Sequence, residues 1–224
     1  MSAAPHWIDG LKAPLLVSWQ ITRDCDLCCL HCCTESAPGK RMPGELAADE
    51  ALALANDIVR QRRPLRDALW RRAAGRSALL RAGRGARAAG RAAQDRNQWA
   101  ASSIRGVADR LARLPIRSIQ VSLDGDSEDV YQRQRPGGSL ARAHAACRAA
   151  REAGLPLEVT FAPTRLNIHE AEQVIERARS LGAFRFNTGR LMRIGTAARL
   201  WDKLEPDAAQ YERFLDRPGT ATGG

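Results

Sequence analysis

The chain has 224 residues, 44% of them hydrophobic, which suffices for one large domain or two small ones with a substantial core. It has no apolar run long enough to span a bilayer and no basic start followed by an apolar stretch, so we expect a cytosolic protein without membrane contact. The net charge of +10 would ordinarily indicate a nucleic-acid partner, but residues 61–105 hold 12 Arg and 2 Asp while the remainder is balanced. We therefore expect no nucleic-acid partner for the chain as a whole.

The N-terminal part predicts a strand, a cysteine-rich loop and a helix. Residues 15–22 (LLVSWQIT) favour a strand, and residues 45–59 carry apolar side chains at helical spacing. Between them, CDLCCLHCC (residues 25–33) holds five of the six cysteines. In a reducing compartment such a cluster holds metal more often than it forms disulfides, whereas Cys147, alone in an alanine-rich helix, reads as a small buried residue.

The second half alternates helices and strands, which is typical of parallel βαβ units in an α/β fold. Helices are predicted at residues 107–114, 140–153 and 169–181, and strands at residues 116–123, 155–163 and 183–187. Ser139 is placed to cap the second of these helices, and Asn167 with Glu170 forms a cap-like pair before the third. Gly154 and Gly182 are placed to end the same two helices.

Three cysteines, Cys25, Cys29 and Cys32, form a C-x3-C-x2-C pattern directly after the first predicted strand. Three thiolates on one short loop can hold three corners of a cubane iron–sulfur cluster and leave the fourth iron open to an outside ligand. The adjacent Cys28 and Cys33 leave open a zinc site built from two C-x2-C pairs, or one that includes His31.

The stretch ITRDCDLCCLHC resembles the signature of the radical S-adenosylmethionine (SAM) superfamily. The resemblance implies a partial (β/α)6 barrel, a [4Fe-4S] cluster on the three cysteines, and SAM bound at the open iron. It further implies reductive cleavage of SAM to a 5′-deoxyadenosyl radical, with flavodoxin or ferredoxin as reductant. The resemblance covers residues 14–60 and 107–213 of a predicted core at 1–213, and residues 214–224 are expected to form a flexible tail.

Two downstream stretches are similar to the SPASM-type peptide-modifying maturases for pyrroloquinoline quinone and mycofactocin, which implies a peptide or small-molecule substrate. In QVSLDGDSEDVYQRQRPGGSLARA (residues 120–143), Ser122 and Asp124 match positions at the end of the fourth strand, and Arg135 matches an arginine that pairs with the SAM carboxylate. The ordinary alternative is a strand-ending turn with a solvated surface arginine. In FNTGRLMRIGTAARLWDKLEP (residues 186–206), Leu191 and Met192 match a region that helps to seat adenine, although core packing is the more ordinary role.

Residues 62–105 depart from the family pattern, which requires a G-G-E-P motif after the second strand and a T-N-G-like turn after the third. Residues 67–75 read DALWRRAAG where the first motif belongs, and residues 94–99 read QDRNQW where the second belongs. Among residues 61–105, 28 are Ala, Arg or Gly, and none of their runs could supply a buried strand. The family-like pattern is therefore interrupted between its first and fourth strands.

A shift of one base in the implied codons restores both motifs. Residues 69–74 (LWRRAA) can be encoded by CTN TGG CGN CGN GCN GCN, and the shifted frame then permits C-G-G-E-P-L. The same shift permits K-I-E-T-N-G across residues 94–100 (QDRNQWA) and the apolar run P-Y-V-M-L across residues 64–68. We therefore expect that residues 62–105 are translated out of frame, through either a frameshift pair or a sequencing error. This also explains the charge, since GC-rich DNA read out of frame yields Arg, Ala and Gly.

The shift has a chemical consequence, because Arg71, Arg72 and Ala73 lie in the stretch where the motif requires two Gly and the Glu that pairs with the SAM ammonium. We expect this chain to fold poorly and to lack activity as written. The alternative is an Arg-rich insertion that binds RNA or another polyanion.

Overall fold

The computed structural model describes residues 20, 22–47, 49–51, 53–54, 101–113 and 118–216. The chain divides into two compact units, one made of Met1–Ile21 with Pro43–Gln94 and the other of Thr22–Met42 with Asp95–Gly224. The second, which we call the core unit, contains nearly all the described residues. The predicted strand at 15–22 and most of the segment at 62–105 lie outside the described residues, as does most of the predicted helix at 45–59, of which residues 49–51, 53 and 54 are helical.

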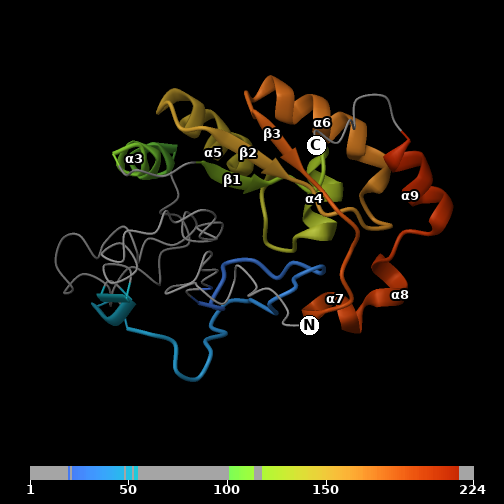
Figure 1. Cartoon of the computed structure of the whole chain (residues 1–224), viewed down its shortest axis with the longest axis horizontal. Helices are drawn as coiled ribbons and strands as arrows, with labels where there is room; N and C mark the ends of the chain where they lie inside the picture. Colours follow the sequence, from blue (N-terminus) through green and yellow to red (C-terminus); the bar gives the residue numbers. More distant parts are fainter. Residues whose placement is uncertain are drawn as a thin grey trace, which may run out of the picture. The chain divides into compact units, whose positions relative to one another are not determined.

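Three parallel strands form the sheet of the core unit, in the order β1 (Ile119–Ser122), β2 (Leu157–Thr160) and β3 (Arg185–Asn187) (Figure 1). Val121 is paired with Val159, and Val159 with Phe186, so the three strands run in one register. All three lie inside the predicted strand segments. Parallel strands require crossover connections, and helices supply them here.

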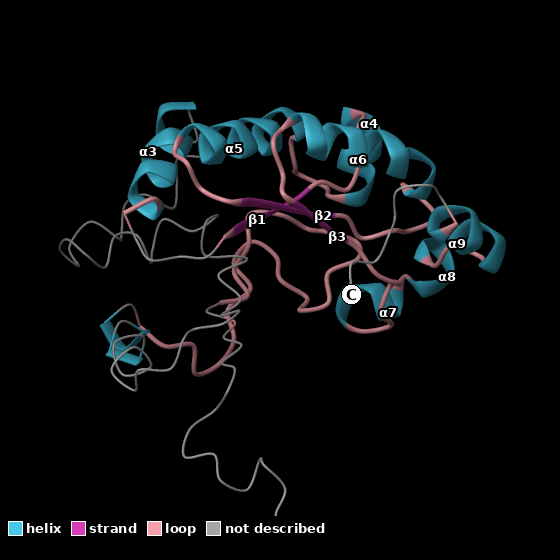
Figure 2. Cartoon of the chain, turned by 45° about the horizontal axis from the view of Figure 1, so that its top comes forward, coloured by secondary structure: helices cyan, strands magenta, loops and turns pink. Residues whose placement is uncertain are grey.

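Helices connect the strands and continue beyond the sheet. Their bounds are α3 (Ala101–Leu111), α4 (Glu128–Gln134), α5 (Leu140–Glu152), the 3-10 helix η3 (Ile168–Glu170), α6 (Ala171–Ser180), α7 (Gly195–Arg199), α8 (Trp201–Leu204) and α9 (Ala208–Leu215). Helices α4, α5 and α6 lie on the same side of the strands (Figure 2). The α/β class with parallel βαβ units is therefore confirmed.

The ends of α5 follow the sequence signals. The Ser139 hydroxyl accepts a hydrogen bond from the Arg142 amide at 3.4 Å, and Gly154 follows the helix with φ of +71°. Helix α3, by contrast, begins at Ala101 rather than at residue 107. Gly106 weakens the local helical pattern there by about 1 kcal/mol, and packing of α3 against α5 outweighs that cost.

The predicted cap formed by Asn167 and Glu170 is wrong. Neither side chain caps α6, which is preceded instead by η3. The Asn167 amide donates to the carbonyl oxygens of Asp124 and Ala162, each at 3.0 Å. Both residues therefore stabilise tertiary structure rather than their own helix.

Glu170 accepts hydrogen bonds at the start of α4. One of its carboxylate oxygens accepts from the amides of Asp126 and Ser127 at 2.7 and 3.1 Å, and the other from the Ser127 hydroxyl at 2.5 Å. A carboxylate at a helix N-terminus pairs with amides that lack intrahelical partners. Glu170 thereby ties the loop after β2 to the loop after β1.

The core continues into the segment that was predicted to be a flexible tail. Phe161 is fully buried, and its ring centroid lies 6.2 Å from that of Phe186 and 6.0 Å from that of Phe214. Phe214 is 2% exposed and α9 ends at Leu215, so the tail predicted from residue 214 is wrong for its first residues. Burial of one phenylalanine, worth about 1.5–3 kcal/mol, helps to stabilise this last helical turn.

Cys147 is fully buried in α5, as predicted, and burial raises the pKa of its thiol from 9.0 to about 12. The unfolded chain loses this proton near pH 9, whereas the folded chain keeps it until about pH 12. The free energy of unfolding should therefore fall as the pH rises between these values. Urea unfolding at a series of pH values from 7 to 10.5 should show this fall, with a shallower one in Cys147→Ala. Equal slopes in the two proteins would contradict the burial of this thiol.

Candidate active site

The cysteine loop is closed at its base by backbone hydrogen bonds. The Cys25 amide donates to the Ala37 carbonyl and the Ala37 amide to the Arg23 carbonyl, both at 3.1 Å. Inside the loop, Cys32 is buried and its sulfur accepts a hydrogen bond from the Ser36 amide at 3.3 Å. The backbone therefore holds Cys25 and Cys32 within one closed turn of chain.

Cys29, which lies between these two cysteines in the sequence, is half-buried in a charged environment. Burial raises the pKa of its thiol to about 11, Arg135 acts to lower it, and Asp124, Cys25 and Cys32 each act to raise it. The other two predicted ligands are thus close enough to influence the ionisation of Cys29. Because metal and cluster ligation requires thiolates, binding there would release protons.

The three thiols are of the donor type that an iron–sulfur cluster takes. They share one loop and interact electrostatically, and thiolates are the ligand type that such clusters require. In the described part of the chain, no three His, Cys, Asp or Glu side chains are arranged to hold one metal ion.

A buried ion pair lies directly beside Cys29. Asp124 is completely buried after β1 and pairs with Arg135, whose side chain is 12% exposed. The second carboxylate oxygen of Asp124 accepts from the Ala162 amide at 2.8 Å, and Nη1 of Arg135 lies 3.6 Å from the Cys29 sulfur. Burial acts to lower the pKa of Arg135, but the anionic groups around it, chiefly Asp124, outweigh this and raise the pKa.

The ordinary reading of Arg135 as a solvated surface charge is therefore wrong. The structure brings Arg135 and Asp124 together with the cysteine loop. Ser122 is half-buried at the last position of β1, where it is paired in register with Thr160.

A chain of buried polar groups extends from Asp124, and sequence reasoning missed most of it. His31 Nε2 lies 3.3 Å from Asp124 Oδ2, and His31 Nδ1 lies 2.8 Å from Gln134 Nε2. The Thr164 hydroxyl donates to Gln134 Oε1 at 2.8 Å, and the Thr164 amide donates to Asn167 Oδ1 at 2.7 Å. The sequence signal for Gln134 is that it follows the buried Val130 by four positions, on the same face of α4. A polar residue on a buried face needs a hydrogen-bond partner.

Helix α7 closes on the cysteine loop from the C-terminal part of the chain. The Thr196 amide donates to the Cys32 carbonyl at 2.8 Å, and Gly195 has φ of +60°. A Cβ at Gly195 would lie 2.4 Å from the Cys32 carbonyl oxygen and 2.6 Å from that of Cys33. Arg199 also forms an ion pair with Glu35, and its hydrogen bond and charge lower the pKa of that carboxyl. Sequence reasoning did not predict this contact.

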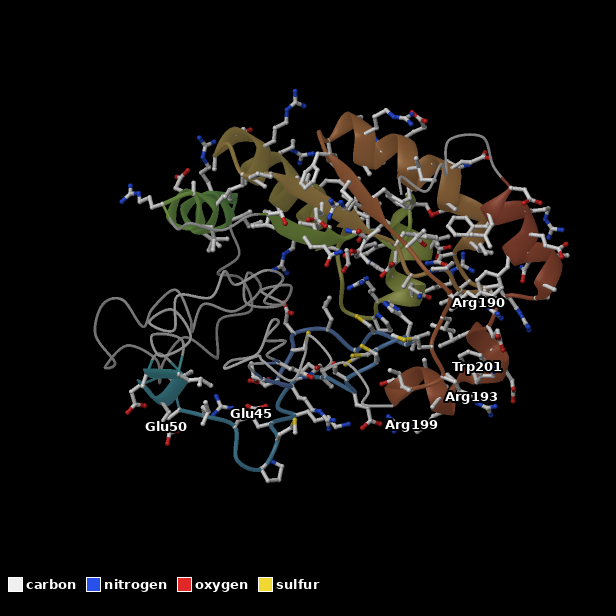
Figure 3. All side chains as sticks on the ribbon, in the orientation of Figure 1. Glu45, Glu50, Arg190, Arg193, Arg199 and Trp201 are labelled. Carbon is white, nitrogen blue, oxygen red and sulfur yellow. The ribbon has the colours of Figure 1, made fainter. Side chains whose placement is uncertain are left out.

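Leu191 and Met192, which match the region that helps to seat adenine, lie in the segment before α7. Met192 is 61% exposed, so the ordinary expectation of core packing is wrong for it. The Leu191 amide donates to the Tyr211 hydroxyl at 3.1 Å. Nearby, the guanidinium carbon of Arg193 lies 5.7 Å from the centroid of the Trp201 ring (Figure 3).

Comparison with known proteins gives a consistent result. The family model described as the Radical SAM superfamily matches residues 19–178. Mycofactocin maturase MftC of Mycobacterium ulcerans is 28% identical over 224 residues, covering 96% of this chain and 58% of that protein. The AdoMet-dependent heme synthase of Methanosarcina barkeri is 26% identical over 209 residues, covering 91% and 57%. The chain thus spans somewhat more than half the length of these relatives.

A solved structure supports the fold. The radical SAM methyltransferase from Sphaerobacter thermophilus superposes with a TM-score of 0.50 at 18% identity, covering 89% of this chain and 62% of that one. At that identity the likeness concerns the fold alone.

Proposed function

This chain belongs to the radical SAM superfamily, whose enzymes use a [4Fe-4S] cluster and SAM, and on that premise we propose that Cys25, Cys29 and Cys32 hold the cluster. When bound, the cluster would pass one electron from a reductant such as flavodoxin or ferredoxin to SAM, whose cleavage would give methionine and a 5′-deoxyadenosyl radical. The observation that carries the proposal is the position of the buried Asp124–Arg135 pair against Cys29.

Arg135 is proposed to receive the SAM carboxylate. Asp124 engages Nε and Nη2 of its guanidinium, which leaves the Nη1 edge directed toward Cys29. A guanidinium fixed on one side can pair with a second carboxylate through its remaining N–H groups. Ser122 and Asp124 would line the same end of β1, where ligands bind in parallel α/β sheets.

The substrate is proposed to be a peptide or small-molecule precursor in cofactor biosynthesis. The support is similarity to proteins named mycofactocin maturase and AdoMet-dependent heme synthase, extending over more than 90% of this chain. We place the reaction in the cytoplasm, because clustered thiols persist in reducing compartments. No helix in the described ranges is long and apolar enough to cross a membrane.

Residues 62–105 are proposed to be translated out of frame, with low activity of this chain as the result. The support is that one shifted frame permits both G-G-E-P and T-N-G, and that the excess of positive charge is confined to this segment. Replacement of the motif by Arg71, Arg72 and Ala73 would remove the carboxylate that pairs with the SAM ammonium. Independent sequencing of the source DNA across these codons tests the frame directly.

Anaerobic reconstitution with iron and sulfide tests the cluster assignment. The wild-type chain should take up about four iron and four labile sulfide, as one cubane requires. Serine at Cys25, Cys29 and Cys32 together should abolish this uptake. Serine at Cys28 and Cys33 is the matched control, because these cysteines are exposed neighbours in the same loop, and it should leave the uptake intact.

Cleavage of SAM is then measured as 5′-deoxyadenosine released under dithionite. We expect little release from this chain and substantial release from a version with residues 62–105 restored to the shifted frame. Zinc uptake without labile sulfide would overturn the cluster assignment. Full activity of the chain as written would overturn the out-of-frame proposal but not the cluster.

A further inference from the structure

Gln134, the last residue of α4, is completely buried although it carries a polar amide. Burying such a group is costly unless both of its ends find hydrogen-bond partners. Both ends are paired, Nε2 with His31 Nδ1 and Oε1 with the Thr164 hydroxyl, each at 2.8 Å. One side chain thus connects the cysteine loop with the loop that follows β2.

The backbone around Gln134 contacts the same loop. The Leu30 amide donates to the Gln134 carbonyl at 3.1 Å, and the Cys28 amide donates to the Pro136 carbonyl at 3.3 Å. The last carbonyls of a helix lack intrahelical partners, so the cysteine loop satisfies groups that α4 leaves open. These contacts fall on both sides of Cys29, at residues 28, 30 and 31.

Thr164, the partner of Gln134 on the far side from His31, is itself held in place. It is completely buried, and Asn167 accepts from its amide while donating to the carbonyl oxygens of Asp124 and Ala162. The position of Thr164 is therefore set by the ends of β1 and β2. Because Thr164 is fixed, its hydrogen bond to Gln134 also fixes the amide that binds His31, the residue before Cys32.

We propose that Gln134 is a positioning residue for the cluster site, which holds residues 28–31 so that Cys29 and Cys32 keep their orientation. The relation to the cluster rests on the proposed function above. The hydrogen bonds of Gln134 to His31 and Thr164 are present in the protein without cofactor. Outer partners of metal ligands commonly change metal affinity by about 10- to 100-fold when they are removed.

The test compares Gln134→Met with Gln132→Met. Methionine keeps the approximate length of glutamine but cannot form the two hydrogen bonds. Gln132 is exposed on the same helix and donates a hydrogen bond to Glu128 at 2.8 Å, so it serves as the matched control. In the full chain without cluster, iodoacetamide labelling of each cysteine is followed by mass spectrometry under anaerobic conditions.

Labelling of Cys29 and Cys32 should be about tenfold faster in Gln134→Met than in wild type or Gln132→Met, because the loss of two buried hydrogen bonds favours opening of the loop by roughly that factor. Labelling of the buried Cys147 should be unchanged, which separates loosening of the loop from general unfolding. Equal labelling of Cys29 and Cys32 in the two glutamine variants, or a parallel rise at Cys147, would overturn the positioning role. If Gln134→Met does not fold, Thr164→Val removes the same support from the other side and is read by the same criteria.

Iron release to a chelator after reconstitution gives a second reading, and we expect it to be 10- to 100-fold faster in Gln134→Met. A wild-type chain that takes up no labile sulfide would refute the proposed function. The labelling comparison would still decide the role of Gln134, so the two failures are distinguishable.

Discussion

Asp124→Ala should lower the free energy of unfolding by about 3–5 kcal/mol, because it leaves the buried Arg135 guanidinium without its counter-ion. The cost arises from an uncompensated buried charge and from lost partners at the Ala162 amide and at His31. Urea unfolding of the chain without cluster, followed by far-UV circular dichroism, measures this change. Labile sulfide uptake should fall as well, since Arg135 lies beside Cys29 and His31, which loses its partner, is part of the cysteine loop.

Asp129→Ala is the matched control for this measurement. Asp129 forms an exposed ion pair with Arg133 on α4, and its side chain is 78% exposed. Such pairs contribute little to stability, so the variant should unfold close to wild type. A second comparison replaces both partners, as Asp124→Leu with Arg135→Met, and should recover much of the lost stability. If Asp124→Ala costs no more than Asp129→Ala, the buried ion pair is not formed in solution.

Gly195→Ala should destabilise the contact between α7 and the cysteine loop by about 2–5 kcal/mol, combining overpacking with backbone strain. The added Cβ would meet two backbone carbonyl oxygens, those of Cys32 and Cys33, at 2.4 and 2.6 Å. Backbone atoms cannot rotate aside as a side chain can, and φ of +60° disfavours any residue with a Cβ. The loop that carries Cys32 must therefore shift or α7 must detach.

Thermal unfolding and labile sulfide uptake measure this effect, and both should fall in Gly195→Ala. Gly189→Ala is the matched control, because a Cβ there meets nothing within 4 Å and φ at Gly189 is not positive. We expect this control to resemble wild type. Wild-type sulfide uptake by Gly195→Ala would show that α7 does not lie against the cysteine loop.

Local patterns in the sequence predicted most of the elements of the core unit. Alternation of apolar residues identified all three strands, and Ser139 and Gly154 identified both ends of α5. The cysteine spacing identified the superfamily, which the comparisons confirm. These predictions succeeded because helix caps, strand periodicity and ligand spacing act over a few residues and are written contiguously in the chain.

Predictions that depended on distant partners were wrong. Asn167 and Glu170 have the residue types of a helix cap, but carbonyl and amide groups about 40 positions earlier bind their side chains. Phe214 looked like part of a tail because its partner, Phe161, lies more than 50 positions away. A local pattern records which side chains favour burial or hydrogen bonds, but it does not record which partner they find.

The sequence by itself determined the α/β class, the spacing of the three cysteines in the superfamily motif, and the superfamily of this protein. Only the tertiary structure decided that Asp124 and Arg135 form a buried pair beside Cys29, and that Gln134 and Gly195 hold the same loop. The physical reason is that a buried polar group is stable only with a partner of matching geometry. That partner comes from another strand end or helix end, which folding alone brings within hydrogen-bond distance.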